Sequence, residues 1–359
     1  MTLPAIQSRK EPRIDRTAEG GRYIRQELFR SIGREGQEKL RATHVALIGC
    51  GALGSAVADL LIRAGVGELT IVDRDYVELH NLQRQSLFTE ADVASHMPKA
   101  ETAANVLASI NSEASIRPIV ADFNGSNAEQ IASDATILVD GTDNFETRYL
   151  INDLAAKTRK PWIYGGVIAS HGTTMTIRPG ETSCLRCLFP TPPAPGSTPT
   201  CDTAGVIGPA IHVIASIEVA EAMKLAVGDI DALNRHMLTI DLWNLTFDRV
   251  LVGSPRTDCP TCGARNFEFL DRARPSQATV LCGHDAIQVL PDLASDLDLE
   301  VLAQRLRPAG DVMANRFLLR YVDPVSQCQL TVFPDGRAII KGTTDESEAR
   351  SVYARFIGA

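Results

Sequence analysis

A strand, a glycine-rich turn and a helix near the start of the chain constrain its fold more than any other feature. His44–Cys50 is a short apolar run rich in strand-forming residues, and it leads into a turn with the spacing Gly-x-Gly-x-x-Gly. A helical stretch, Ser55 to Ala64, follows, and a second strand, Leu69–Val72, ends at Asp73. Strand, glycine turn, helix and strand in this order form a βαβ unit, which requires two parallel strands.

The same alternation continues towards the middle of the chain. Lys99–Ile110 is predicted to be a helix, and strands are predicted near Ile116–Val120 and Thr136–Val139. Apolar strands such as the last are typical of a parallel sheet that is buried on both faces. Four further strands are predicted, at Trp162–Ile168, Thr173–Ile177, Leu238–Leu242 and Phe247–Val252. We therefore predict an α/β fold, a doubly wound Rossmann-like sheet with an antiparallel extension.

The sequence divides into three parts. Residues 1–20 are polar and lack periodicity, and they are predicted to be a mobile tail. Residues 21–265 form the predicted α/β domain, and residues 275–359 read as a small C-terminal α+β domain. In the latter, a Pro-Asp-Gly turn joins strands Gln329–Phe333 and Ala338–Ile340 into a hairpin. This domain could bind a partner, assist dimerisation or be a passive appendage.

Charge and hydropathy exclude several classes of function. The chain has 359 residues and a formal net charge of -8, which argues against nucleic-acid or anionic-membrane partners. No apolar run reaches the roughly 18–20 residues of a membrane helix. The N-terminus lacks the apolar core of a secretion signal, so a cytoplasmic location is expected. Because four of the eight cysteines form two Cys-x-x-Cys pairs, metal binding or catalysis is favoured over disulfides.

The glycine turn predicts a nucleotide site. Gly49, Gly51 and Gly54 would let the backbone approach a phosphate at the start of the helix. Asp73 lies about 20 residues beyond, where a carboxylate accepts hydrogen bonds from ribose hydroxyls. These features alone indicate an adenine nucleotide and favour NAD, because NAD-binding domains of this kind are abundant.

Two cations beyond the second strand favour ATP instead. Arg84 and Lys99 follow the nucleotide motif, in a stretch dense in hydrogen-bond donors. Cleavage at the α-phosphorus of a triphosphate builds negative charge on pyrophosphate, and fixed cations stabilise that charge. A dinucleotide-binding or non-catalytic scaffold protein is the competing interpretation, and a comparison of ATP with NAD binding would decide between the two.

Five motifs in a fixed order carry a resemblance to a known family. They are Arg22-Tyr23-x-Arg25-Gln26, the glycine turn, Asn81-Leu82-Gln83-Arg84-Gln85, Pro98-Lys99-Ala100 and Thr142-Asp143-Asn144. Together they resemble the MoeB/ThiF/HesA family of sulfur-carrier-protein adenylyltransferases, which are related to ubiquitin-activating enzymes. The resemblance covers about residues 21–265.

The resemblance implies a role for each matching residue. Arg25 would reach the ATP of the neighbouring subunit, so that the active unit is a homodimer. Asp143 lies just beyond a predicted strand, where a carboxylate can hold Mg²⁺ against phosphates. The alternative for Asp143-Asn144 is a turn or a helix cap. The other implied contacts are the ribose with Asp73, and the phosphates with Asn81, Arg84 and Lys99.

The paired cysteines predict a structural zinc site. Cys184, Cys187, Cys259 and Cys262 are two Cys-x-x-Cys hooks, and four thiolates would close a tetrahedral Zn²⁺ shell. About 70 residues separate the hooks, more than in a compact zinc ribbon. The resemblance supports zinc, because the family has its cysteine pairs at these two places. Redox-active or unpaired thiols are the alternatives.

The predicted reaction is ATP-dependent adenylylation of the C-terminal glycine of a ubiquitin-like sulfur carrier (MoaD/ThiS-like) that ends in Gly-Gly. An external donor, a cysteine desulfurase or a rhodanese, would then supply sulfur for a thiocarboxylate. Cys201 follows a proline-rich loop and matches the family's loop cysteine, which relays sulfur or bonds the carrier in some members. The alternatives are a modifier-activating enzyme with a thioester at Cys201, or a Cys201 without a role.

Overall fold

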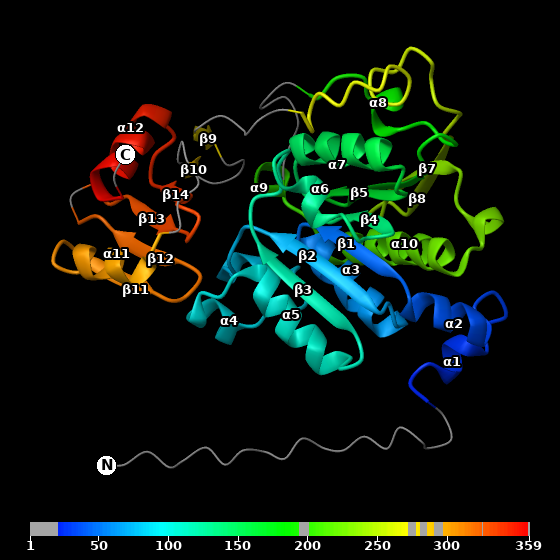
Figure 1. Cartoon of the computed structure of the whole chain (residues 1–359), viewed down its shortest axis with the longest axis horizontal. Helices are drawn as coiled ribbons and strands as arrows, with labels where there is room; N and C mark the ends of the chain where they lie inside the picture. Colours follow the sequence, from blue (N-terminus) through cyan, green and yellow to red (C-terminus); the bar gives the residue numbers. More distant parts are fainter. Residues whose placement is uncertain are drawn as a thin grey trace.

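The structure is a computed structural model that describes residues 21–193, 201–271, 278–280, 286–290, 297–324 and 326–357. The predicted tail, residues 1–20, lies outside the described residues. Two sheets organise the described part of the chain, one in each half of Figure 1. None of the described helices is both long and apolar enough to cross a lipid bilayer.

The larger sheet, as far as the chain is described, has eight strands in the order β3-β2-β1-β4-β5-β6-β7-β8. The strands are β1 His44–Ile48, β2 Glu68–Asp73, β3 Ser115–Val120, β4 Ile137–Asp140, β5 Trp162–Ile168, β6 His171–Ile177, β7 His236–Asp241 and β8 Thr246–Leu251. Strands β3 to β5 in this order pair in parallel, and β5 to β8 pair antiparallel. This confirms the predicted doubly wound sheet with an antiparallel extension.

Helices cover both faces of this sheet. Helices α2 Gly33–Arg41, α3 Ala52–Ala64, α5 Lys99–Ile110 and α10 Gly208–Val227 pack on one face, and α6 Ala128–Ile131 and α7 Phe145–Thr158 pack on the other (Figure 1). Alternate residues of β1 show the consequence, since Val45 and Leu47 join one core and Ala46 and Ile48 join the other. Burial on both faces explains why β1 reads as a continuous apolar run.

Shorter helical segments connect these elements. They are α1 Ile24–Glu27, η1 Leu79–Asn81, α4 Glu90–Ser95, α8 Leu185–Leu188, α9 Cys201–Ala204 and η2 Ile230–Ala232. Helices α1 and α2 lie against the C-terminal end of α3, because the Nε2 atoms of Gln26 and Gln37 both donate to the carbonyl oxygen of Ala64, at 2.7 and 3.0 Å.

A second, antiparallel sheet follows, in the order β11-β12-β13-β14-β10-β9. Its elements are β9 Ala278–Val280, β10 Ala286–Val289, α11 Leu299–Leu306, β11 Asp311–Ala314, β12 Leu319–Val322, β13 Gln329–Val332, β14 Ala338–Lys341 and α12 Glu346–Phe356. We call this set the C-terminal unit. Helices α11 and α12 cover one face of its sheet and enclose a separate apolar core. On the other face, Ile339 and Phe333 pack on Tyr76, which follows β2.

Candidate active site

The candidate site lies where the strand order of the large sheet reverses. From β1 the chain moves outward to β2 and β3, and it then returns to the other side of β1 to form β4 and β5. The carboxyl ends of β1, β2 and β4 therefore meet at one edge. Open α/β sheets bind ligands at this position.

The glycine turn packs too closely for side chains. A Cβ atom on Gly54 would overlap the carbonyl oxygen of Gly49, and a Cβ atom on Gly141, just after β4, would overlap the same oxygen. Gly49 itself has φ of +90°, which disfavours any residue with a side chain. Gly51 differs, because the nearest atom to a Cβ there is the Nε2 of Gln85 at 4.0 Å. The turn thus packs tightly against Gly141 at the end of β4, while Gly51 leaves room for a ligand beside it.

Asp73 ties the end of β2 to this turn. One carboxylate oxygen accepts a hydrogen bond from the backbone N–H of Cys50 and the other from that of Asp75, each at 2.7 Å. Burial raises the pKa of Asp73, and the charge of Lys99 opposes this rise. A carboxylate has about four acceptor positions, so about two remain for the donors of a ligand.

Lys99, the first residue of α5, is a buried cation at the same edge. Its side chain is 9% exposed, and its Nζ lies 3.1 Å from Oδ2 of Asp75. Burial would lower the pKa of Lys99, but the charges of Asp75 and Asp73 raise it. Partial burial would raise the pKa of Asp75, but Lys99 and then Arg74 lower it. Both groups are therefore charged at neutral pH.

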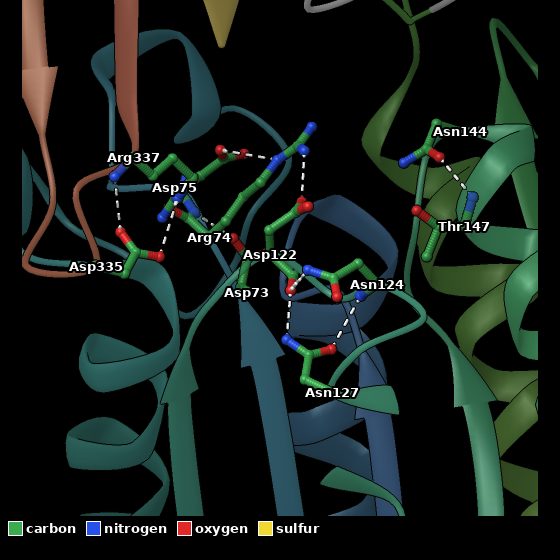
Figure 2. Close-up of polar contacts among 10 residues, drawn as sticks. All are labelled: Asp73, Arg74, Asp75, Asp122, Asn124, Asn127, Asn144, Thr147, Asp335 and Arg337. Carbon is green, nitrogen blue, oxygen red and sulfur yellow. Dashed lines mark hydrogen bonds and ion pairs between the residues drawn. The ribbon is translucent and has the colours of Figure 1, made fainter. Parts of the chain in front are cut away.

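Arg74 extends the cluster towards β3 (Figure 2). Its Nη1 donates to Oδ1 of Asp122 at 2.7 Å. The backbone oxygen of Asp122 accepts from Nδ2 of Asn124 at 3.1 Å and from Nδ2 of Asn127 at 2.7 Å. These bonds fix the loop after β3 beside the end of β2, so the edge is polar from β3 to β4.

Asp143 and Asn144 have different roles in the structure. Asn144 is the N-cap of α7, and its Oδ1 accepts from the backbone N–H of Thr147 at 2.9 Å (Figure 2). Asp143 is exposed, and its charge helps to raise the pKa values of Lys99 and Arg74 after their nearer partners. The cap interpretation thus holds for Asn144, while Asp143 contributes negative charge near Lys99 and Arg74.

A buried ion pair supports the loop that carries Asp143. Nε of Arg148 lies 3.1 Å from Oδ2 of Asp140, and its Nη2 donates to the backbone oxygens of Thr142 and Gly165 at 2.9 and 3.0 Å. Because the guanidinium is planar and has five donors, it fixes several loop atoms at once.

Asn81 and Arg84 lie on the segment between β2 and α5. Asn81 is buried in η1, and its Oδ1 accepts from the backbone N–H of Glu78 at 3.0 Å. Arg84 is half-buried, and its Nη1 donates to the carbonyl oxygen of His80 at 2.7 Å. Both side chains are thus held by local contacts.

Arg25 lies away from the glycine turn of its own chain. It is an exposed residue of α1, and α1 contacts the C-terminal end of α3. The glycine turn is at the N-terminal end of α3, and a helix of 13 residues is about 20 Å long. An arginine side chain cannot span this distance, so Arg25 does not join the cluster of its own chain.

The four paired cysteines form one cluster. All four Sγ atoms of Cys184, Cys187, Cys259 and Cys262 lie within 4.8 Å of one another. The closest pairs are at 3.3, 3.6 and 3.8 Å. Tetrahedral zinc, with Zn–S bonds of about 2.3 Å, requires sulfur atoms about 3.8 Å apart. The predicted meeting of the two hooks is confirmed, and the donor set fits zinc.

Comparisons with known proteins agree with this geometry. The model of the ThiF family matches residues 23–261. This chain belongs to the ThiF family. It is 44% identical over 340 residues to the "Sulfur carrier protein ThiS adenylyltransferase" of Bacillus subtilis, which covers 94% of this chain and 99% of that protein. It is 38% identical to the "SAMP-activating enzyme E1" of Haloferax volcanii, over 70% of this chain and 91% of that protein.

A solved structure has a similar fold. The ThiF-family chain matches the crystal structure titled E. coli MccB with ATP, with a TM-score of 0.59 and 25% identity. The match covers 68% of this chain and 75% of that one. The ThiF-family sequence was recognisable from ordered motifs, and the family assignment is confirmed.

Some residues of this ThiF-family site were missed by sequence reasoning. The predicted residues Asp73, Lys99 and Asp143 do gather at the glycine turn, but Asp75, Arg74 and Asp122 were not predicted. The Asp-x-Asp spacing at the end of β2 could have indicated Asp75. The side chain of Cys201 lies outside the described residues, although its backbone begins α9.

Proposed function

We propose that this chain uses ATP to adenylylate the C-terminal carboxylate of a ubiquitin-like sulfur-carrier protein that ends in Gly-Gly. The observation that carries the proposal is the buried, charged Lys99 beside the glycine turn and Asp73, at the sheet edge where ligands bind. Relatives named as adenylyltransferases of sulfur carriers support the choice of reaction.

The chemistry requires charge stabilisation more than proton transfer. A carboxylate oxygen of the carrier attacks the α-phosphorus, a new P–O bond forms, and the bond to the bridging oxygen breaks. Pyrophosphate leaves with the bonding electron pair, and the carrier retains an acyl-adenylate. Because a carboxylate is already nucleophilic, the enzyme needs no strong base. Lys99, Arg84 and Asn81 would hold the phosphates as charge develops.

The nucleotide and its metal would take the remaining groups of the site. The open Gly51 position and the amides at the start of α3 would contact phosphate, and Asp73 would hold the ribose. The exposed Asp143 carboxylate is suited to Mg²⁺, which prefers one or two carboxylates together with phosphate oxygens. Magnesium would neutralise part of the triphosphate charge.

Arg25 would act in the site of a second subunit. Its position, about one length of α3 away from its own glycine turn, supports a homodimer in which each α1 serves the partner's nucleotide. Zinc at the four cysteines would have a structural role, because four thiolates leave no open coordination position.

Sulfur would reach the adenylated carrier from another protein, a cysteine desulfurase or a rhodanese. Cys201 would relay it, and Cys201→Ala tests this role. We expect the variant to retain pyrophosphate exchange but to lose most thiocarboxylate formation. Unchanged thiocarboxylate formation would remove Cys201 from the mechanism.

The adenylylation itself is tested by exchange of labelled pyrophosphate into ATP. We expect exchange that depends on the enzyme, on Mg²⁺ and on a small carrier ending in Gly-Gly. The matched control is the same carrier with its terminal carboxylate converted to an amide, which cannot attack phosphorus. No exchange with any carrier of this type, or equal exchange with the amide, would contradict the proposed function.

A further inference from the structure

The C-terminal unit grips the segment that carries the phosphate-directed side chains. Tyr76 lies on this segment, one residue after Asp75, and is 4% exposed. Its ring packs in a cluster with Phe333 and Ile339 of the C-terminal unit. The guanidinium of Arg320 and the ammonium of Lys341 lie 5.6 and 5.7 Å from the centre of the ring. The ring is therefore enclosed by the face of the sheet that α11 and α12 leave uncovered.

Polar contacts join the same two parts of the molecule. Nζ of Lys341 lies 2.5 Å from Oε1 of Glu78. Nη1 of Arg320 lies 2.9 Å from Nδ1 of His96. Glu78 lies near the start of the segment between β2 and α5, and His96 lies near its end. These contacts therefore hold both ends of that segment.

The gripped backbone sets the position of Lys99 relative to Asp75. The backbone N–H of Lys99 donates to the carbonyl oxygen of Asp75 at 2.8 Å, and that of Val77 donates to Met97 at 3.1 Å. Tyr76 and Pro98 thus form an antiparallel β-bridge, and the neighbouring residues, Asp75 and Lys99, form the ion pair. The C-terminal unit therefore packs on the same backbone segments that carry this ion pair.

Arg337, on the turn between β13 and β14, points into this junction (Figure 2). It is 1% exposed, and its Nη2 donates to the backbone oxygen of Arg74 at 3.1 Å. Its Nε lies 3.7 Å from Asp335, an ion pair too long for a hydrogen bond. Among the described residues, Nε and Nη1 have no hydrogen-bond partner. A buried guanidinium with unused donors favours an additional acceptor.

Asp75 is the nearby acidic group that Arg337 could serve. In the structure its charge is compensated mainly by Lys99, and Arg337 contributes more weakly to the lowered pKa of Asp75. If Lys99 turns to the phosphates, Asp75 loses its principal partner. Asp75 would then keep only Arg74, whose Nε lies 3.9 Å from its Oδ1 and whose Nη1 already donates to Asp122. A carboxylate with so distant and shared a counter-charge would repel a triphosphate beside it.

We propose that Arg337 is a positioning residue of the nucleotide site: it takes over the Asp75 carboxylate and so releases Lys99 to bind the phosphates of ATP. The C-terminal unit is then an integral part of the site. This inference rests on the proposed use of ATP, and it goes beyond that function by assigning a role to a residue outside the ThiF-matched region.

Binding of α,β-methylene-ATP with Mg²⁺, measured by calorimetry without any carrier, tests the inference. Arg337→Met keeps the volume beside Phe333 and removes the charge, a replacement that buried ionic sites often tolerate. We expect the dissociation constant to rise roughly tenfold, the effect of weakening one charge-assisted contact. Arg337→Gln is a second variant with the same expectation, and Arg337→Lys should recover part of the affinity.

The Asp75→Asn background separates positioning from a merely structural effect. There the carboxylate charge is gone, so Arg337→Met should change the dissociation constant less than about twofold. The matched control is Arg350→Met, an exposed arginine of α12, which should bind as the wild type does. Wild-type affinity in Arg337→Met and Arg337→Gln, or an equal loss in both backgrounds, would overturn the inference alone. A wild-type protein that binds no ATP analogue would instead overturn the proposed function.

Discussion

Gly51 and Gly54 belong to the same turn, but their surroundings give them different functions. A Cβ atom on Gly54 would overlap the backbone oxygen of Gly49, and neither atom can move without displacing β1 or α3. A Cβ atom on Gly51 would meet only the Nε2 of Gln85, at 4.0 Å, on the turn where we propose that a phosphate binds. One glycine therefore serves packing, and the other serves the ligand.

The two alanine variants should separate stability from binding. Gly54→Ala should lower the free energy of unfolding by about 3 kcal/mol or more, because the overlap is with backbone. Gly51→Ala, at the N-cap of α3, should cost about 1 kcal/mol or less but weaken ATP binding roughly tenfold. Urea unfolding and calorimetry measure both quantities. Equal stability of the two variants would contradict this division.

Glu218 makes the stability of the protein depend on pH. It is fully buried on α10 beside Gly165, and neither carboxyl oxygen has a hydrogen-bond partner in the described residues. Burial, and then the charge of Asp140, raise its pKa well above the usual range, against the effect of Arg148. The folded protein therefore keeps a proton that the unfolded chain releases above pH of about 4.3.

From this it follows that wild-type stability falls as pH rises between the unfolded-state and folded-state pKa values. The slope from one proton is at most about 1.4 kcal/mol per pH unit. Glu218→Gln keeps the shape and removes the proton release, so its stability relative to wild type should increase from pH 5 to pH 8. Urea unfolding at each pH measures this, with the exposed Glu90→Gln as a control for the loss of one carboxylate. A pH-independent difference for Glu218→Gln would refute the argument.

Prediction from sequence was best for elements with one strong physical signal. Strands β1 and β4 are buried on both faces, so their apolar runs indicated them directly. Helix α7 was missed because it buries polar side chains. Asn152 accepts from the backbone N–H of Leu185, and Asp153 accepts from Thr261, so inward-facing polar residues obscure the apolar period.

The site shows the same limit. Asp73 and Lys99 stand next to recognisable motifs, and sequence reasoning found them. Arg337 contacts Arg74 across 263 positions, and nothing in the surrounding sequence indicates its partner. Contacts of this kind come from the docking of separate elements, which local patterns do not encode.

At the scale of elements, the cysteine cluster links α8 to the loop before residue 263. We expect one zinc per chain by metal analysis, and Cys259→Ser should lose the metal and lower the melting temperature. Cys328→Ala, which removes a buried thiol of the C-terminal unit, should keep its zinc. A Cys259→Ser protein that retains zinc and wild-type melting would show that the cluster holds no structural metal.

At the scale of the whole molecule, the placement of Arg25 predicts complementation between inactive variants. Arg25→Ala and Lys99→Ala should each be nearly inactive in pyrophosphate exchange. Co-expression should restore about one quarter of wild-type activity, because random pairing makes half of the dimers mixed and each mixed dimer has one complete site. Separately purified variants, mixed without subunit exchange, are the control. No recovery in co-expressed dimers would show that Arg25 does not act in the partner subunit's site.

The packing of the C-terminal unit on Tyr76 also has a consequence for synthesis of the protein. Synthesis runs from the N-terminus, so the glycine turn and Lys99 leave the ribosome long before Phe333, Arg337 and Ile339 exist. Until β14 has been synthesised, the segment between β2 and α5 of the nascent ThiF-family domain lacks its contacts with the C-terminal unit. An unfinished or proteolytically shortened chain would then consume little ATP. The enzyme would become active only after its C-terminal unit has been synthesised.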